Sequence, residues 1–163
     1  MIPVLSTLIY LGIGSPQNED QPIEIRRAEI AAAKTEANRN KDEAAAELQK
    51  AIAATKSTPK NVESWLKLAQ AASVTGNSDT EINALQTAVN ITNGDASILA
   101  LLAEALSRAA DGQVTVPARA LLKTVLKTDP DEPRALFLLG LAAYQDGDHM
   151  VAIKNWQRLL SIS

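Results

Sequence analysis

Cysteine is absent from the 163 residues, and histidine occurs once, as His149. Without cysteine, a disulfide-stapled fold, a zinc–thiolate site and a thiol nucleophile are excluded. His149 directly follows a Gly-Asp turn, and a single imidazole leaves few ways to build a metal site or an acid–base pair. A Ser-His-Asp arrangement is therefore not credible, and we expect His149 to be exposed and without a catalytic role.

Glycine, aromatic residues and net positive charge are also scarce. The seven glycines are scattered, so no glycine-rich phosphate loop is present. The pairs Asp129/Asp131 and Asp146/Asp148 flank a proline and a glycine, which marks them as turn residues rather than metal ligands. A net charge of −3 with no basic cluster argues against nucleic-acid binding. We expect no enzyme, no catalytic residue, no metal and no cofactor.

What the chain does contain is a large apolar fraction built from alanine and leucine. Apolar residues make up 46% of the sequence and aromatic residues only 3%. Alanine has the highest helix propensity, and leucine loses little side-chain freedom in a helix. β-branched residues never alternate with polar ones, as they would in a strand. The composition therefore predicts an all-α fold.

The first 22 residues differ from the rest. Residues 2–13 are mostly apolar, but no basic region precedes them and they are too short to span a bilayer. Two interpretations stay open: a juxtamembrane remnant of an anchored protein, or a hydrophobic tail that folds onto the domain. Residues 14–22 contain two prolines, a glycine and an acidic cluster, as a linker does. Residues 1–22 are therefore treated as a juxtamembrane-like segment with a linker.

Residues 23–58 predict a charged, alanine-rich helical segment. Its apolar stripe is thin until Leu48, Ala51 and Ile52, and the polar run at residues 38–40 is a candidate interruption. We expect its first half to extend from the body or to be mobile.

Three similar segments then fill residues 59–163, at 62–95, 96–132 and 133–163, the second with a lengthened inner turn. In each, small residues sit where two helices would cross and large ones beside them, which resembles the 34-residue tetratricopeptide repeat. We predict a superhelix of about three helical hairpins preceded by an N-terminal helix. Asn93-Gly94 and Asp129-Pro130 are the expected helix ends.

Stacked hairpins create a curved body whose first helices line the concave side. The expected lining mixes apolar residues with acids and arginines, which suits an amphipathic helix laid into a groove and suits catalysis poorly. The predicted peptide-binding residues are Leu66, Gln70, Ser73, Glu104, Arg108, Arg134, Phe137, Leu141, Tyr144 and Gln145. As an alternative, Phe137, Leu141 and Tyr144 pack under the N-terminal helix and meet no partner.

A closer resemblance covers nearly the whole chain. Three stretches carry it in order: LIYLGIGSPQNEDQPIEIRR, AAAELQKAIAATKSTPKNVESWLKLAQ and DGQVTVPARALLKTVLKTDPDEPRALFLLGLAAYQDGDHMVAIKNWQRLL. Together they are similar to the periplasmic tetratricopeptide repeat domain of the CcmI/CycH family of cytochrome c biogenesis factors. That family also has an N-terminal membrane portion, which this sequence lacks.

The resemblance implies a chaperone at the periplasmic face of the bacterial inner membrane, anchored through the missing segment. Its expected partners are the C-terminal helix of apocytochrome c and the subunits of the haem lyase complex. Phe137, Leu141, Tyr144 and Arg134 are the best candidates for client contact, and Arg134 and Arg108 for pairing with a client carboxylate. Two alternatives stay open: a structural scaffold that binds no transient client, and a regulatory module in the cytoplasm.

Overall fold

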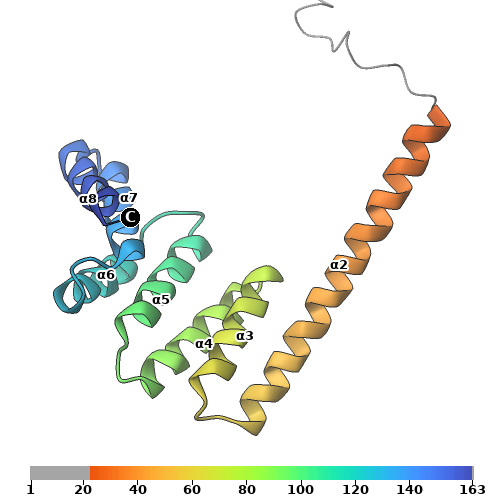
Figure 1. Cartoon of the computed structure of the whole chain (residues 1–163), viewed down its shortest axis with the longest axis horizontal. Helices are drawn as coiled ribbons and strands as arrows, with labels where there is room; N and C mark the ends of the chain where they lie inside the picture. The colour runs from red at the N-terminus through yellow and green to blue at the C-terminus, as the bar shows by residue number, and fades with distance from the viewer. Residues whose placement is uncertain (1–22, 163) are drawn as a thin grey trace, which may run out of the picture. The chain divides into compact units, whose positions relative to one another are not determined.

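The computed structural model describes residues 23–162, and all regular elements within that range are helices (Figure 1). Their bounds are α2 (Ile23–Ser57), α3 (Val62–Val74), α4 (Ser78–Ile91), α5 (Ala96–Ala109), α6 (Val116–Thr128), α7 (Pro133–Gln145) and α8 (His149–Ser161). The predicted segment of residues 1–22 lies outside the described range. The chain divides into two compact units between Asn40 and Lys41, inside α2.

The described part of the first unit is the first half of α2. All its described side chains, from residue 25 to residue 40, are exposed. The predicted interruption at residues 38–40 is wrong, because α2 is continuous through it. Alanine, glutamate, lysine and arginine surround the two asparagines, and these strong helix formers outweigh their modest helix cost. Between residues 23 and 162, no helix combines the length and the apolar content that crossing a bilayer requires.

The second unit is a stack of three helical hairpins, which confirms the predicted repeat fold. Helix α3 packs against α4, α5 against α6, and α7 against α8, while α4 contacts α5 and α6 contacts α7 (Figure 1). We call α3, α5 and α7 the first helices, and α4, α6 and α8 the second helices. The end of α2 joins this stack through the buried side chains of Ala51 and Thr55.

Each hairpin helix begins at a capping side chain. An oxygen of that side chain accepts a hydrogen bond from a backbone N–H of the first turn, which otherwise has no partner. The caps are Asn61, Asn77, Asp95, Thr115, Glu132 and Asp148. The predicted helix ends are also observed. Asn93 and Gly94 have φ angles of 54° and 90°, and α6 stops just before Asp129-Pro130.

The core lies between the helices of neighbouring hairpins, in two apolar clusters. Small residues permit the close crossings, most clearly in the third hairpin, where a Cβ on Gly140 would overlap the indole of Trp156. The indole N–H of Trp156 donates to the carbonyl oxygen of Phe137 at 3.2 Å. Gly140 therefore lets α8 approach the backbone of α7 directly.

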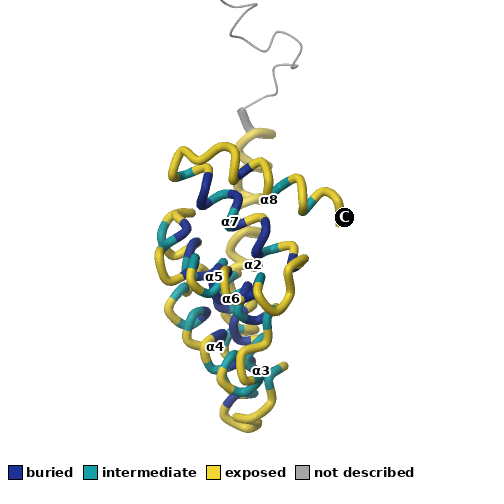
Figure 2. Tube along the Cα trace, turned by 90° about the vertical axis from the view of Figure 1, so that its left-hand side faces the viewer, coloured by how far each residue is buried: buried dark blue, intermediate teal, exposed yellow. Residues whose placement is uncertain are grey.

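The last hairpin is less covered than the others. Leu85, Leu122 and Trp156 occupy equivalent positions on the second helices, and the two leucines are 3% and 0% exposed. Trp156 is only half-buried, and Ala152 is the single buried residue of α8. Figure 2 shows the same contrast, with buried positions along α5 and α7 and mainly exposed ones along α8. Within the described chain, no further helix covers α8.

Candidate functional site

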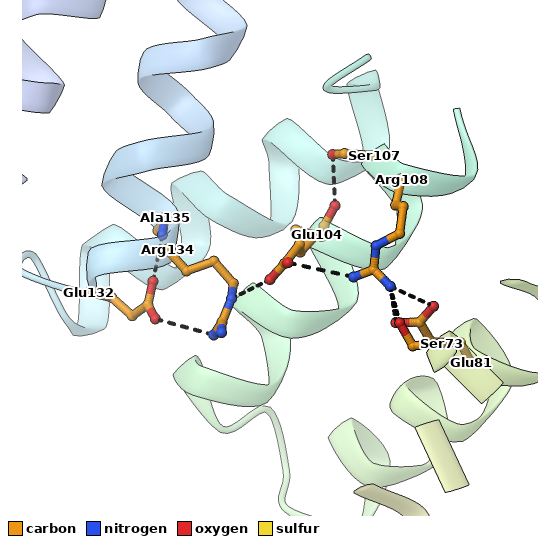
Figure 3. Close-up of polar contacts among 9 residues, drawn as sticks. Ser73, Glu81, Glu104, Ser107, Arg108, Glu132, Arg134 and Ala135 are labelled. Atoms are coloured by element: carbon orange, nitrogen blue, oxygen red, sulfur yellow. Dashed lines mark hydrogen bonds and ion pairs between the residues drawn. The ribbon is translucent and has the colours of Figure 1, made fainter. Parts of the chain in front are cut away.

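Four of the polar residues predicted for the binding face join one network around Glu104, namely Ser73, Glu104, Arg108 and Arg134 (Figure 3). Arg108, one turn further along α5, places Nη2 3.5 Å from Glu104 Oε1. Arg134, from α7, forms an ion pair with the other oxygen of the same carboxylate. Glu104 thus joins the second and third hairpins on the face that their first helices share.

The network continues to the first hairpin through Glu81 of α4. Arg108 Nη1 lies 2.9 and 3.0 Å from the two carboxylate oxygens of Glu81, and it also bonds the hydroxyl of Ser73. The Glu81 side chain is only 8% exposed. A carboxylate removed from water in this way needs a charged partner, which makes Arg108 a structural residue.

Arg134 is held in a similar way. Besides Glu104, its guanidinium lies 4.0 Å from Oε1 of Glu132, whose other oxygen accepts a hydrogen bond from the backbone N–H of Ala135. Glu132 is therefore both the cap of α7 and the second partner of Arg134. Both arginines predicted to bind a client carboxylate already have carboxylate partners within the chain, so a client would compete with them.

Gln145, another predicted binding residue, holds the long turn of the second hairpin. Its side-chain oxygen accepts from the N–H of Val114 at 3.0 Å, and its nitrogen donates to the carbonyl of Gly112 at 2.8 Å. Beside it, Arg119 of α6 forms an ion pair with Asp146. Hydrogen bonding from Arg119 lowers the pKa of the Asp146 carboxyl below its ordinary value.

The predicted apolar residues divide by exposure. Leu66 and Leu141 are half-buried and pack against the two core clusters. Phe137 and Tyr144, both on α7, are 49% and 56% exposed. The ring of Tyr144 lies 5.5 Å from that of His149 and 6.2 Å from that of Trp156, measured between centroids. Phe137 and Tyr144 are therefore available to a partner, and the alternative that they are buried is wrong for these two aromatics.

Gln70, the last predicted residue, lines a cavity of about 510 Å³ between α2 and α3. We call this cavity the α2–α3 groove. Its lining is mainly small and apolar, and it consists of Ala44, Glu47, Lys50, Ala51, Ala54, Lys67, Gln70, Ala71 and Val74. All these residues belong to the second unit.

The sequence did not predict this groove, because the repeat pattern is evident only from Val62 onward. A usable signal was present: Pro59 precedes Val62 by three residues, as Pro130 precedes Pro133.

Among residues 23–162, no group of three acidic or histidine side chains is close enough to hold a metal ion. The arrangement as a whole offers helix-sized surfaces and paired charges.

Comparison with known proteins places these features in a family. The family model described as "Cytochrome c-type biogenesis protein H TPR domain" matches residues 31–163. The cytochrome c-type biogenesis protein CycH of Rhizobium meliloti is 28% identical over 99% of this chain, and that of Pseudomonas aeruginosa is 25% identical over 99%. This chain spans only 40% and 37% of those two proteins.

Other similarities cover less of the chain or concern the fold. NrfG of Escherichia coli O157:H7, a formate-dependent nitrite reductase complex subunit, is 26% identical over 66% of this chain and 54% of its own length. The crystal structure of MamA aligns with a TM-score of 0.62 at 24% identity, over 77% of this chain and 71% of MamA. The Cut9–Hcn1 structure aligns with a TM-score of 0.65 at 19% identity, over 73% of this chain and 22% of that one. Both structures support the repeat fold.

Proposed function

The chain belongs to the cytochrome c-type biogenesis protein H TPR domain family, and from this premise we propose that it is a chaperone module in cytochrome c maturation. In this proposal it binds the C-terminal helix of apocytochrome c and presents it to the haem lyase complex. Its place is the periplasmic face of the bacterial inner membrane. The names of the CycH relatives support the pathway, and the surface of α7 supports the binding mode.

The observation that carries the proposed binding mode is the exposed aromatic pair of Phe137 and Tyr144. The two residues are seven apart on one helix, which places them on the same face two turns apart. Leu141 lies between them and is half-buried. An amphipathic client helix can bury its apolar stripe against this surface, gaining roughly 25 cal/mol per Å² of apolar area removed from water.

The polar residues of the predicted site have a different part in this proposal. Ser73, Glu104, Arg108 and Arg134 are joined in the network around Glu104, and Gln145 holds the neighbouring turn. They keep the first helices in place and supply a polar border to the apolar surface. Client selection therefore depends on the apolar stripe more than on a terminal carboxylate.

The direct test is a binding titration with a peptide that carries the C-terminal helix of a c-type apocytochrome. We expect saturable binding, weakened about tenfold by Phe137→Ala or Tyr144→Ala, because each removes an exposed aromatic anchor. Both variants should keep the melting temperature of the unaltered chain. Amidation of the peptide's C-terminus should change the affinity little.

Val116→Ala is the matched control, since Val116 is another exposed apolar side chain, at the start of α6. It should leave binding unchanged. Absence of binding at several hundred micromolar peptide, with the domain folded, would reject the proposal. Equal loss in the control would place the client elsewhere.

A second candidate function is a structural scaffold that joins two subunits without a transient client. The uncovered surface of α8 favours it, since Met150, Ile153 and Leu160 are 78%, 46% and 74% exposed. A scaffold would form a long-lived complex through α8, and Leu160→Ser would weaken that complex while leaving peptide binding intact. Unchanged assembly in this variant would remove the scaffold candidate.

A further inference from the structure

We propose that the α2–α3 groove is a docking site for an amphipathic helix donated by a partner protein. The helix would occupy the first-helix position of an incomplete hairpin whose second helix is the last part of α2. This site goes beyond the proposed client surface on α7 and does not depend on it.

The register of the chain identifies the last part of α2 as a second helix. Ala51, Leu85 and Leu122 each precede the start of the next first helix by eleven residues. Ala54, Ala88 and Val125 each precede it by eight, and Glu47, Glu81 and Ala118 by fifteen. In the complete hairpins, Leu85, Ala88, Leu122 and Val125 are all at most 3% exposed.

The corresponding residues of α2 line the groove, although Ala51 also packs in the first core cluster and is 8% exposed. They are Glu47, Ala51 and Ala54. Helix α2 is continuous from Ile23, so no turn precedes these residues and the described chain supplies this hairpin with no first helix of its own. The groove therefore corresponds to the space that a first helix fills in each later hairpin.

The side chains of the groove indicate what the donated helix must bring. Ala51 stands where the later hairpins have leucine, leucine and tryptophan, so the floor is shallow and leaves volume to be filled. The donated helix therefore needs bulky apolar side chains at the spacing i, i+3, i+4 and i+7, which places them on one face. A volume near 510 Å³ is within the range of ordinary ligand pockets.

The charges at the border require no charged ligand. Lys50 pairs with Glu47 at 2.6 Å, and Lys67 pairs with Glu63 at 3.5 Å, each within its own helix. Val74, on the α3 side, is 72% exposed and is apolar. Recognition would therefore depend on apolar volume, with the two ion pairs flanking the bound helix.

The absence of cysteine permits a sensitive test by disulfide trapping on the full chain. An Ala54→Cys chain carries one thiol in the groove, and a Lys56→Cys chain carries one on the same helix outside it. The probe is a synthetic peptide with the sequence of residues 61–74, in which the position of Ala69 is cysteine. At equilibrium in a buffer of oxidised and reduced thiol, we expect at least tenfold more peptide disulfide at residue 54 than at residue 56. Each yield is divided by the yield of the disulfide with 2-mercaptoethanol at the same residue.

Two further variants separate docking from thiol reactivity. A peptide with serine at the positions of Trp65 and Leu68 should lose the excess adduct, because it lacks the bulky apolar side chains. Val74→Glu in the Ala54→Cys chain should lose it too, since a charge would then border the groove. Val74 is exposed, so the chain should stay folded. Equal adduct at residues 54 and 56, or an excess that survives the serine peptide, would overturn the proposal.

Other occupants give different results. If a second copy of the chain fills the groove, the unlabelled protein will self-associate in sedimentation and Ala54→Leu will abolish this, which would overturn the assignment to a partner. If the apocytochrome helix occupies the groove, Ala54→Leu will weaken its binding, which would also overturn it. The proposal expects Ala54→Leu to abolish the NMR shifts caused by the unmodified peptide of residues 61–74 and to leave client binding unchanged, whether or not the client binds α7.

Discussion

The junction between α2 and α3 and the junction between α4 and α5 use equivalent positions of the repeat, yet only the second is closed by charge. Val74 and Arg108 are each the thirteenth residue of their helix. Arg108 reaches back to the equivalent of Glu47, which is Glu81, and forms two hydrogen bonds with it. Val74 has no such reach, and it lines the α2–α3 groove together with Glu47.

The junction between α6 and α7 differs from both, because a cavity of about 340 Å³ is lined by residues of α6, α7 and α8. The thirteenth residue of α7 is Gln145, which forms hydrogen bonds with the turn at residues 112–114. One position of the repeat therefore makes a different contact at each junction: valine lines the α2–α3 groove, arginine forms an ion pair, and glutamine forms neutral hydrogen bonds. The backbone pattern fixes where the helices lie, and this side chain adds a junction-specific contact to the helices that fill the space in the later hairpins.

The largest expected effect on stability comes from copying the small core residue of the α2–α3 junction, Ala51, into the equivalent position of the α6–α7 junction, Leu122. Leu122→Ala should lower the free energy of unfolding by about 3 kcal/mol, because a fully buried leucine leaves a cavity behind. Urea denaturation of the full chain measures it. The reverse change at the equivalent position, Ala51→Leu, should stabilise by about 0.5 to 1 kcal/mol by filling the groove. If both variants lowered the free energy of unfolding by similar amounts, the proposed difference between the two junctions would be contradicted.

An intermediate effect is expected from Arg108→Val, which copies Val74 into the second junction. Glu81 would remain buried without its charged partner, and the free energy of unfolding should fall by about 2 kcal/mol. The double variant Glu81→Ala/Arg108→Val should regain about half of that loss, since alanine already occupies the equivalent position 118. No recovery in the double variant would show that the ion pair is not the cause.

The smallest effect concerns the ion pair between Arg119 and Asp146, which bridges the second and third hairpins. Because Arg119 lowers the pKa of Asp146, the stabilisation is present above the ordinary carboxyl pKa of about 4 and is lost as the pH falls through the lowered value. Asp146→Asn should therefore cost a little stability at pH 7 and nothing in strong acid. Asp146 is half-exposed, so the cost is small. A difference that grows toward acid pH would contradict this sign.

The sequence predicted most of the fold, because small and large residues recur at fixed spacing and each hairpin carries its own caps. Trp65, Leu99 and Leu136 begin the pattern, and Asn93-Gly94 and Asp129-Pro130 end helices as expected. The predicted break at residues 38–40 was wrong, since two asparagines do not stop a helix whose neighbouring residues favour it.

The candidate site was less predictable, since its polar members depend on partners distant in sequence. Its position in the repeat alone made Arg108 a candidate for ligand binding. Only the fold shows that Glu81, 27 residues earlier in the sequence, already forms an ion pair with it. The exposure of Phe137 and Tyr144 likewise depends on what packs beside α7. The α2–α3 groove was missed because a second helix without its first does not stand out as a repeat.

The most direct measurement is an NMR titration of the isotope-labelled full chain with two peptides in turn. Our account predicts that the peptide of residues 61–74 shifts the amide signals of Ala51, Ala54, Ala71 and Val74. The apocytochrome helix should instead shift those around Phe137 and Tyr144. If both peptides shift the same residues, or if the first shifts none of the groove residues, the open junction is not a helix site.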